Sequence, residues 1–314
     1  MPQVLTVGET MALIDPLDDG PYEYGTRLQL RIAGAESNFA IALSRLGIGV
    51  SWISCVGCDP FGDMILTALK SEGVDISRVR CDPEAPTGVF FKWRQRGRSF
   101  NAYYRRGSGA TGLSVKDVPD DALEGVNLVH QSGITTALSD RCRELVPELA
   151  FRAHRRGQLT TFDLNYRPRL WTRPGLAGEA ACEVLANTDW CLCGLDEGNL
   201  IFDTSSPDEL FDVLRAAGAR NVVIRLGAEG AFVSVGDSLE KVKPSPLVDV
   251  VDEIGAGDAF AAGFVYGLLN GWAPQSSVRA GNLIAATALR GTGDWETVAR
   301  LSEIQEDLIA CQVS

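Results

Sequence analysis

The sequence predicts an α/β protein built on a doubly wound, mostly parallel sheet flanked by helices, with a small antiparallel β-sheet lid. Three observations lead to this fold class. Short apolar segments recur along the 314 residues, segments with helical periodicity separate them, and two stretches interrupt the alternation. Strands that alternate with helices form a parallel sheet covered on both faces.

The short segments are rich in Val, Ile, Leu and Thr, a composition that suits buried strands. We expect six of them, at residues 4–7, 50–53, 128–130, 159–162, 189–192 and 222–224.

The helical segments carry start and stop signals. Three expected helices run up to a glycine, a residue that commonly follows a helix C-terminus. Pro207 stands where a further helix, over residues 208–217, would begin, because proline is tolerated at a first helical position. The three helices that end at a glycine are expected at residues 37–46, 59–72 and 139–156.

Two stretches, residues 13–35 and 86–110, lack a helical period. The second is typical of a hairpin, with a strand near residues 88–94, a turn around residues 96–98 and a return strand through residues 100–106. A small sheet that projects from the carboxyl edge of a parallel sheet suits a lid, so both stretches are assigned to it. The remaining residues are assigned to one α/β domain, made of residues 1–12, 36–85 and 111–314.

Composition excludes several classes of function. Lys plus Arg is 29 and Asp plus Glu is 41, so the net charge is 29 − 41 = −12, which disfavours a nucleic-acid binder. No secretion signal is present, and the longest apolar run, residues 259–269, is far short of the ~20 residues that span a bilayer. We therefore expect a cytoplasmic protein with neither nucleic-acid nor membrane partners.

The eight cysteines are spread thinly, which in such a chain indicates reduced thiols. Cys55 and Cys58 have the spacing of a zinc-ligand pair, but no second pair exists and His130 and His154 are the only histidines. A structural zinc usually needs four ligands. We interpret Cys55 and Cys58 as buried thiols at a strand end.

The segment with the clearest chemistry is Gly255-Ala256-Gly257-Asp258, where a β-branched run meets an Ala-rich helix that begins near Gly257. Glycines let backbone N–H groups converge on an anion, and a helix N-terminus adds partial positive charge. Asp258 would repel a phosphate, but it fits the base that takes a proton from a hydroxyl attacking that phosphate. A helix cap is the alternative, and spacing alone leaves the two interpretations equally open.

A second segment, Gly34-Ala35-Glu36-Ser37-Asn38, lies where the first lid stretch meets a helix. Close backbone approach at Gly34 and the side-chain amide of Asn38 would suit sugar hydroxyls. An ordinary helix start explains the same residues equally well.

A third segment follows the strand expected at residues 159–162. Asp163, Asn165 and Arg167 alternate onto one side at the carboxyl edge of the sheet, where ligands of α/β proteins bind. The Arg167 guanidinium could hold a carboxylate or a phosphate. A salt-bridged loop is the alternative.

The return strand of the hairpin places Tyr103 and Arg105 on one face and Tyr104 on the other. Residues 89–110 hold six basic and no acidic side chains, interleaved with aromatic residues, a pattern also seen where bases stack. Because the whole chain is strongly acidic, we favour Arg105 as a fixed cation for a negatively charged substrate.

Two motifs carry a family resemblance. Asp-x-x-Gly-Ala-Gly-Asp-Ala-Phe at residues 252–260 and Gly-Ala-Glu-x-Asn at residues 34–38 resemble the ribokinase-like (PfkB) carbohydrate kinases, whose pattern nearly the whole chain follows. The resemblance implies a catalytic base at Asp258 and a Gly255–Gly257 turn that stabilises the transferring phosphoryl group. The Asp-x-Asn-x-Arg and Leu-Trp of residues 163–171 are similar to the fructokinase and 2-keto-3-deoxygluconate kinase branch.

The resemblance also implies roles for residues that spacing leaves open. Sugar contacts are implied for Gly34, Ala35, Asn38, Tyr103, Arg105, Ile134, Arg167 and Asp294. Nucleotide contacts are implied for Asn165, Arg167, Glu197, Arg225, Gly227, Gly230 and Asn282. Glu197 would also place Mg²⁺, through water. Three positions depart from the residues that many relatives carry: Ala33 replaces Gly, Gly194 replaces Asn and Arg225 replaces Lys.

Together these features predict an ATP-dependent sugar kinase that uses ATP and Mg²⁺, with dependence on a monovalent cation left open. No Gly-Lys dipeptide occurs, so the chain has no Walker P-loop. The branch resemblance, Arg105 and Arg167 favour 2-keto-3-deoxygluconate as substrate, giving its 6-phosphate. The alternative is a fructokinase or another sugar kinase of the family, and the rival from a different class is a catalytically silent sugar-binding regulatory protein. We also expect a homo-oligomer formed through the lid.

Overall fold

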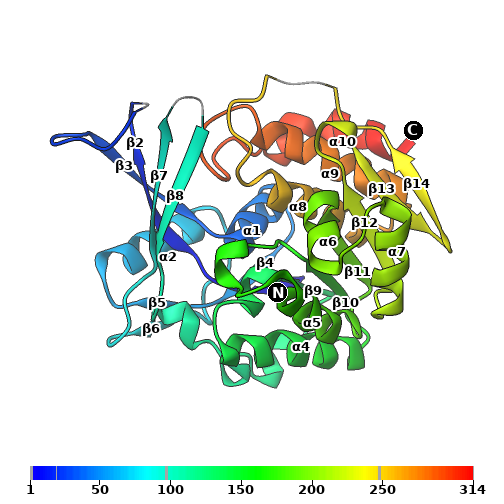
Figure 1. The fold of residues 1–314 in the computed structure, drawn as a ribbon, viewed down its shortest axis with the longest axis horizontal. Coiled ribbons are helices and arrows are strands. Elements are labelled where there is room, and N and C mark those ends of the chain that lie inside the picture. Colours follow the sequence, from blue (N-terminus) through cyan, green and yellow to red (C-terminus); the bar gives the residue numbers. More distant parts are fainter. Residues whose placement is uncertain (1–2, 19, 96–97, 247–248, 314) are drawn as a thin grey trace.

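A central eight-stranded sheet forms the core of the computed structural model, which describes residues 3–18, 20–95, 98–246 and 249–313 (Figure 1). Its strand order is β14-β13-β12-β11-β10-β9-β1-β4. Six strands run parallel and coincide with the six segments expected from the sequence, which confirms that prediction, although the segment expected at residues 189–192 begins one residue later, at Trp190. They are β1 (Val4–Val7), β4 (Val50–Ile53), β9 (Leu128–Ser132), β10 (Leu159–Asp163), β11 (Trp190–Gly194) and β12 (Asn221–Arg225).

An antiparallel hairpin extends one edge of this sheet. It consists of β13 (Ala231–Val235) and β14 (Ser238–Val242), and β13 pairs antiparallel with β12. The sequence analysis did not predict this hairpin.

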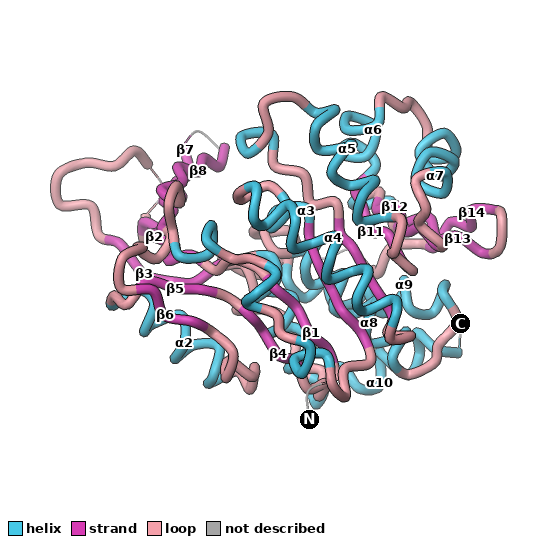
Figure 2. Tube along the Cα trace, turned by 90° about the horizontal axis from the view of Figure 1, so that it is seen from below, coloured by secondary structure: helices cyan, strands magenta, loops and turns pink. Residues whose placement is uncertain are grey.

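Helices cover both faces of the sheet (Figure 2). On one face, Leu192 and Val223 pack with α1, α2, α8, α9 and α10. On the other, their chain neighbours Cys191 and Val222 pack with α4, α5, α6 and α7. This alternation is the doubly wound arrangement that the sequence predicts. The first group comprises α1 (Ala35–Arg45), α2 (Pro60–Ser71), α8 (Ala256–Leu269), α9 (Pro274–Ala288) and α10 (Leu301–Val313). The second comprises α4 (Asp140–Arg155), α5 (Pro174–Leu185), α6 (Leu195–Phe202) and α7 (Pro207–Ala216), and a short α3 (Gly133–Thr136) precedes α4.

A separate four-stranded sheet, here called the lid, stands beside the core (Figure 1). Its order is β3-β2-β7-β8, with β2 (Met11–Pro16), β3 (Leu28–Ala33), β7 (Val89–Gln95) and β8 (Arg98–Tyr104). The two hairpins, β2–β3 and β7–β8, are antiparallel, whereas β2 and β7 pair in parallel. The lid is therefore two antiparallel hairpins joined side by side. The predicted hairpin turn at residues 96–98 falls partly outside the described residues.

A third, two-stranded sheet was not predicted. It joins β5 (Cys55–Gly57) to β6 (Arg80–Asp82) in parallel. Cys55 is buried there, as expected, but Cys58 is exposed, because it lies in the turn that leads into α2. Within the described residues, no helix is long and apolar enough to cross a membrane.

Candidate active site

The site is organised by the start of α8. Gly255 takes a left-handed conformation with φ of 79°, and a Cβ atom at this position would lie 1.8 Å from the backbone oxygen of Asp294. Only glycine fits both restrictions. The following residues begin α8, as predicted, and the first N–H groups of a helix have no partner within it. The Ala256 N–H donates to the Glu253 oxygen at 3.4 Å, so the N–H groups after it are the ones best placed for an anion.

Asp258 lies in the first turn of α8 and is held by neutral amides. Its Oδ2 accepts a hydrogen bond from Asn38 Nδ2 at 2.8 Å, and its Oδ1 accepts one from Asn165 Nδ2 at 3.3 Å. Burial raises the pKa of Asp258 to about 6, against the opposing effects of the Asn38 hydrogen bond and the Arg167 charge. A carboxylate in this state is an effective proton acceptor near neutral pH.

Asn38 reaches Asp258 because α1 begins directly against the chain segment that follows β1. Gly34 precedes α1, and a Cβ at Gly34 would lie 2.2 Å from the backbone oxygen of Glu9. Ala35 is the first residue of α1, and Asn38 is buried within its first turn. The sequence segment interpreted as a possible sugar site is thus brought next to the predicted base.

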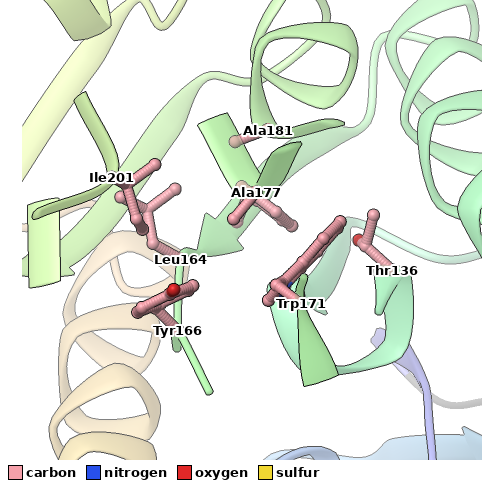
Figure 3. Close-up of a pocket in the computed structure, with 9 residues that line it drawn as sticks. Thr136, Leu164, Tyr166, Trp171, Ala177, Ala181 and Ile201 are labelled. Atoms are coloured by element: carbon pink, nitrogen blue, oxygen red, sulfur yellow. The ribbon is translucent and has the colours of Figure 1, made fainter. Parts of the chain in front are cut away.

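Asn165 comes from the loop after β10, whose side chains alternate. Leu164 and Tyr166 line a small, largely apolar cavity together with Trp171 (Figure 3). Asn165, with a positive φ of 38°, instead contacts Asp258. Asp163 also turns away from the cavity and contacts Arg225. The sequence analysis expected Asp163, Asn165 and Arg167 on one side; Arg167 is exposed and lies near enough to lower the pKa of Asp258.

Arg225 lies at the centre of a partly buried ionic network. Its guanidinium donates to both carboxylate oxygens of Asp163, at 2.6 and 2.8 Å, and to Glu197 Oε1 at 3.2 Å. It also donates to the backbone oxygen of Gly257 at 3.2 Å. Arg225 thereby ties two strand ends to the start of α8. The nucleotide contact expected for Arg225 stays a prediction, as does the one for Glu197, whose Oε2 accepts from the Tyr166 N–H at 2.9 Å.

The lid contacts the site through an ion pair that the sequence analysis missed. Lys92 Nζ on β7 pairs with Asp252 Oδ2, and the exposed fractions of these side chains are only 3% and 4%. Asp294 lies close by, with burial raising its pKa to about 7 and the Lys92 charge opposing this rise. The Asp-x-x-Gly-Ala-Gly-Asp spacing pointed to Asp252, but no sequence signal linked it to Lys92.

Arg105, the predicted substrate cation, pairs with the buried carboxylate of Glu9. The other oxygen of Glu9 accepts a hydrogen bond from Ser108 Oγ at 2.5 Å. Tyr103 stacks on Phe90 at 5.2 Å and lies under the Arg105 guanidinium, as strand alternation predicted. Arg105 is thus oriented by the protein, and its role toward a substrate stays a prediction.

The remaining predicted residues lie further along the sheet edge. Gly227 and Gly230 have positive φ values of 58° and 92° in the turn between β12 and β13. Asn282 on α9 donates from Nδ2 to the backbone oxygen of Lys243 at 2.9 Å. Ile134 lies in α3, whose N-cap Ser132 accepts from the Ile134 N–H at 3.2 Å. Their predicted ligand contacts remain untested.

Comparison with known proteins agrees with this geometry. Residues 1–298 match the model of the pfkB family of carbohydrate kinases. The chain is 35% identical over 294 residues to a 2-dehydro-3-deoxygluconokinase of Bacillus subtilis, covering 93% of this chain and 91% of that one. It is 34% identical over 314 residues to a protein of the same name from Thermoproteus tenax, covering 99% and 95%.

Solved structures place the fold in the same group. A PfkB protein from Polaromonas sp. JS666 superimposes with a TM-score of 0.88, at 33% identity over 97% of this chain and 99% of that one. An E. coli structure in complex with ATP and Mg²⁺ also gives 0.88, at 26% identity over 99% of both chains. The fold and the site therefore define a carbohydrate kinase. The chain belongs to the pfkB family.

Proposed function

We propose that this protein is an ATP-dependent sugar-acid kinase whose substrate is 2-keto-3-deoxygluconate and whose product is the 6-phosphate. The main support for the proposal is the position and orientation of the Asp258 carboxylate. Asp258 stands in the first turn of a helix that begins at a glycine turn, and two amide side chains orient its carboxylate. In the described part of the chain it forms no ion pair, so it is free to take a proton.

The chemistry follows from this arrangement. ATP supplies the γ-phosphoryl group, and bound Mg²⁺ would neutralise charge on the phosphates. Asp258 takes the proton of the attacking sugar hydroxyl, and the N–H groups at the start of α8 stabilise negative charge on the phosphoryl oxygens. Arg225 holds that helix start in place through the Gly257 carbonyl.

The described residues also bear on how Mg²⁺ would be placed. No three His, Cys, Asp or Glu side chains among them gather at a position that could hold a metal ion. Both oxygens of Glu197 already accept hydrogen bonds, from Tyr166, Gly194 and Arg225. We infer that Glu197 would help to place Mg²⁺ through water, and that phosphate oxygens would supply the other contacts.

Two positively charged side chains and the names of similar proteins favour a sugar acid as the substrate. Arg167 is exposed beside Asp258, and Arg105 is fixed at the base of the lid. The Bacillus subtilis and Thermoproteus tenax relatives are both named for this substrate class. The carboxylate of the sugar acid would pair with one or both guanidinium groups.

A second candidate, a fructokinase, is favoured by one observation. Because Arg105 already pairs with Glu9, a neutral sugar would not need to compete for it. The two functions can be separated by measuring ADP release across a panel of sugars and sugar acids. Highest kcat/KM for 2-keto-3-deoxygluconate supports the proposal, and highest kcat/KM for fructose supports the alternative. No ADP release with any sugar would instead favour a silent sugar-binding protein.

Two variants sharpen the substrate test. Arg105→Ala and Arg167→Ala should lower kcat/KM for the acid sugar more than for its neutral analogue, because only the acid offers a carboxylate. The exposed Arg173, which pairs with Glu179 on the surface, gives a matched control as Arg173→Ala. Equal losses with both substrates would show that neither arginine binds the carboxylate.

We further propose that the protein is cytoplasmic and that two copies associate through their lids. The lid exposes apolar side chains, with exposed fractions of 55% for Leu30 and 68% for Tyr104. Such a surface is typical of an interface. Leu30→Asp should convert a dimer to a monomer in size-exclusion chromatography with light scattering. Residues 13–35 and 86–110 remain our proposed bounds for the lid.

A further inference from the structure

The two-stranded β5–β6 sheet brings two exposed thiols together. Cys58 lies one residue after β5, and its N–H donates to the backbone oxygen of Asp82 at 3.0 Å. Cys81 lies on β6, and its Sγ donates to the backbone oxygen of Gly57 at 3.5 Å. The two thiols are close enough for Cys58 to raise the pKa of Cys81, and both residues are exposed. The partner of Cys58 is thus Cys81, not Cys55 with its zinc-ligand spacing.

The neighbouring Cys58 thiol raises the pKa of Cys81 to about 11. Either cysteine can attack a disulfide first as its thiolate, and the bond that forms between them is the same. Cys55, the third cysteine nearby, is buried, and burial raises its pKa to about 11.

The thiol pair lies at the base of the lid. The Gly57 N–H donates to Thr87 Oγ1 at 2.9 Å, and Asp59 Oδ2 accepts from the Thr87 N–H at 2.8 Å. Thr87 lies two residues before β7, the lid strand that carries Lys92 toward Asp252. The turn at Cys58 is therefore connected to the lid by direct hydrogen bonds.

We propose that Cys58 and Cys81 form a modification site at which a low-molecular-weight disulfide produces an intramolecular disulfide bond that restrains the base of the lid. The thiolate of one cysteine attacks one sulfur of the reagent, RSSR, forming a mixed disulfide and releasing RS⁻. The thiolate of the other cysteine then attacks the protein sulfur of that mixed disulfide, forming the Cys58–Cys81 bond and releasing the second RS⁻. RSSR is reduced to two thiols, which take up the two protons that the cysteines lose.

Peptide mapping of the whole protein tests the bond itself. Reduced protein is treated with glutathione disulfide, digested with trypsin without reduction, and analysed by mass spectrometry. Cleavage after Arg45, Lys70, Arg80 and Lys92 separates the two thiols, so the bond joins residues 46–70 to residues 81–92. Cys55→Ser should keep the cross-link, which distinguishes Cys58 from Cys55 on the same peptide. Cys58→Ser and Cys81→Ser should abolish it, and Cys182→Ser, at a partly buried thiol on α5, should keep it.

The effect on the lid is measured separately. Hydrogen exchange of the β7 peptide should slow in the oxidised protein, and turnover in the ADP-release assay should fall and return after dithiothreitol. The turnover measurement rests on the proposed function, whereas mapping and exchange do not, so inactivity of the reduced protein would count against that function alone. Separate glutathione adducts without the cross-link would overturn the site. A cross-link that leaves exchange and turnover unchanged would overturn the restraint on the lid.

Discussion

Asp258 at the start of α8 and the acids at the boundary between lid and core are all largely enclosed by protein, but they are held in opposite ways. Asp258 is oriented by the neutral amides of Asn38 and Asn165. At the boundary, Asp252 pairs with Lys92, and Glu9 pairs with Arg105. A carboxylate held by amides can still accept a proton, whereas one paired with a cation is held in place by that partner. The first arrangement suits chemistry, and the second suits positioning.

The largest expected effect comes from removing the proton acceptor. Asp258→Asn should lower kcat by at least ~10²-fold, the usual size of a general-base contribution, because an amide cannot take the hydroxyl proton. Steady-state ADP release gives kcat, and calorimetric titration with ATP should show that nucleotide still binds. A variant that turns over at the wild-type rate would remove Asp258 from the mechanism.

A smaller loss is expected when the turn before α8 is distorted. Gly255→Ala places a Cβ 1.8 Å from the Asp294 oxygen, so the turn must move and the amides lose their alignment. We expect kcat to fall by ~10-fold or more, since preorganised donors contribute on this scale.

Gly271, just beyond the other end of α8, offers a matched control. It has a similar φ of 72°, but nothing lies within 4 Å of a Cβ there. Gly271→Ala should therefore destabilise the fold slightly without changing kcat. Equal kinetic losses in the two variants would show that backbone strain alone, and not displacement of the site, explains the effect.

Next in size is the ion pair between lid and core. Lys92→Met leaves the buried Asp252 without this cation, and breaking a buried pair in this way costs about 3–5 kcal/mol of stability. Urea denaturation measures the free energy of unfolding. Arg78→Met, at a pair whose side chains are 35% and 59% exposed, should cost less than ~1 kcal/mol. If both variants lose the same stability, the Lys92 pair is not specially buried in solution.

The smallest effect expected is a displaced pH profile. Because burial raises the pKa of Asp258 to about 6, kcat/KM should fall as the pH drops through about 6, not through the usual range of an aspartate. The Asn38 hydrogen bond lowers this pKa, so Asn38→Ala should move the acid limb to higher pH. An acid limb that stays in place in Asn38→Ala would mean that another group controls it.

Much of this architecture could be predicted because it depends on local pattern. The parallel strands, the start of α8 and the approach of Asn38 and Asn165 to the sheet edge all follow from short segments and the rules of α/β folds. The β13–β14 hairpin and the β5–β6 pairing could not be predicted, since their strands are short and partly exposed. Their pairing depends on contacts formed only in the folded chain.

Ionic partners were the hardest part to predict. Arg225 was expected to meet a nucleotide, but the structure also gives it two acidic neighbours, Asp163 at the end of β10 and Glu197 in the first turn of α6. Lys92 was counted as one of several basic residues of a hairpin, and its partner lies 160 positions away in the chain. Sequence spacing does not encode such pairs, because they depend on how distant elements meet.

The parallel pairing of β2 with β7 has a mechanical consequence. Two separate segments of the chain form the lid, one with β2 and β3 and one with β7 and β8. Each segment leaves the core and returns to it, so four backbone connections join the lid to the core. A lid connected in this way can rotate as a unit about the line through its four connections, whereas twisting or sliding would stretch several connections at once. Cleavage of the backbone in any one connection would leave the lid joined to the core by the other three.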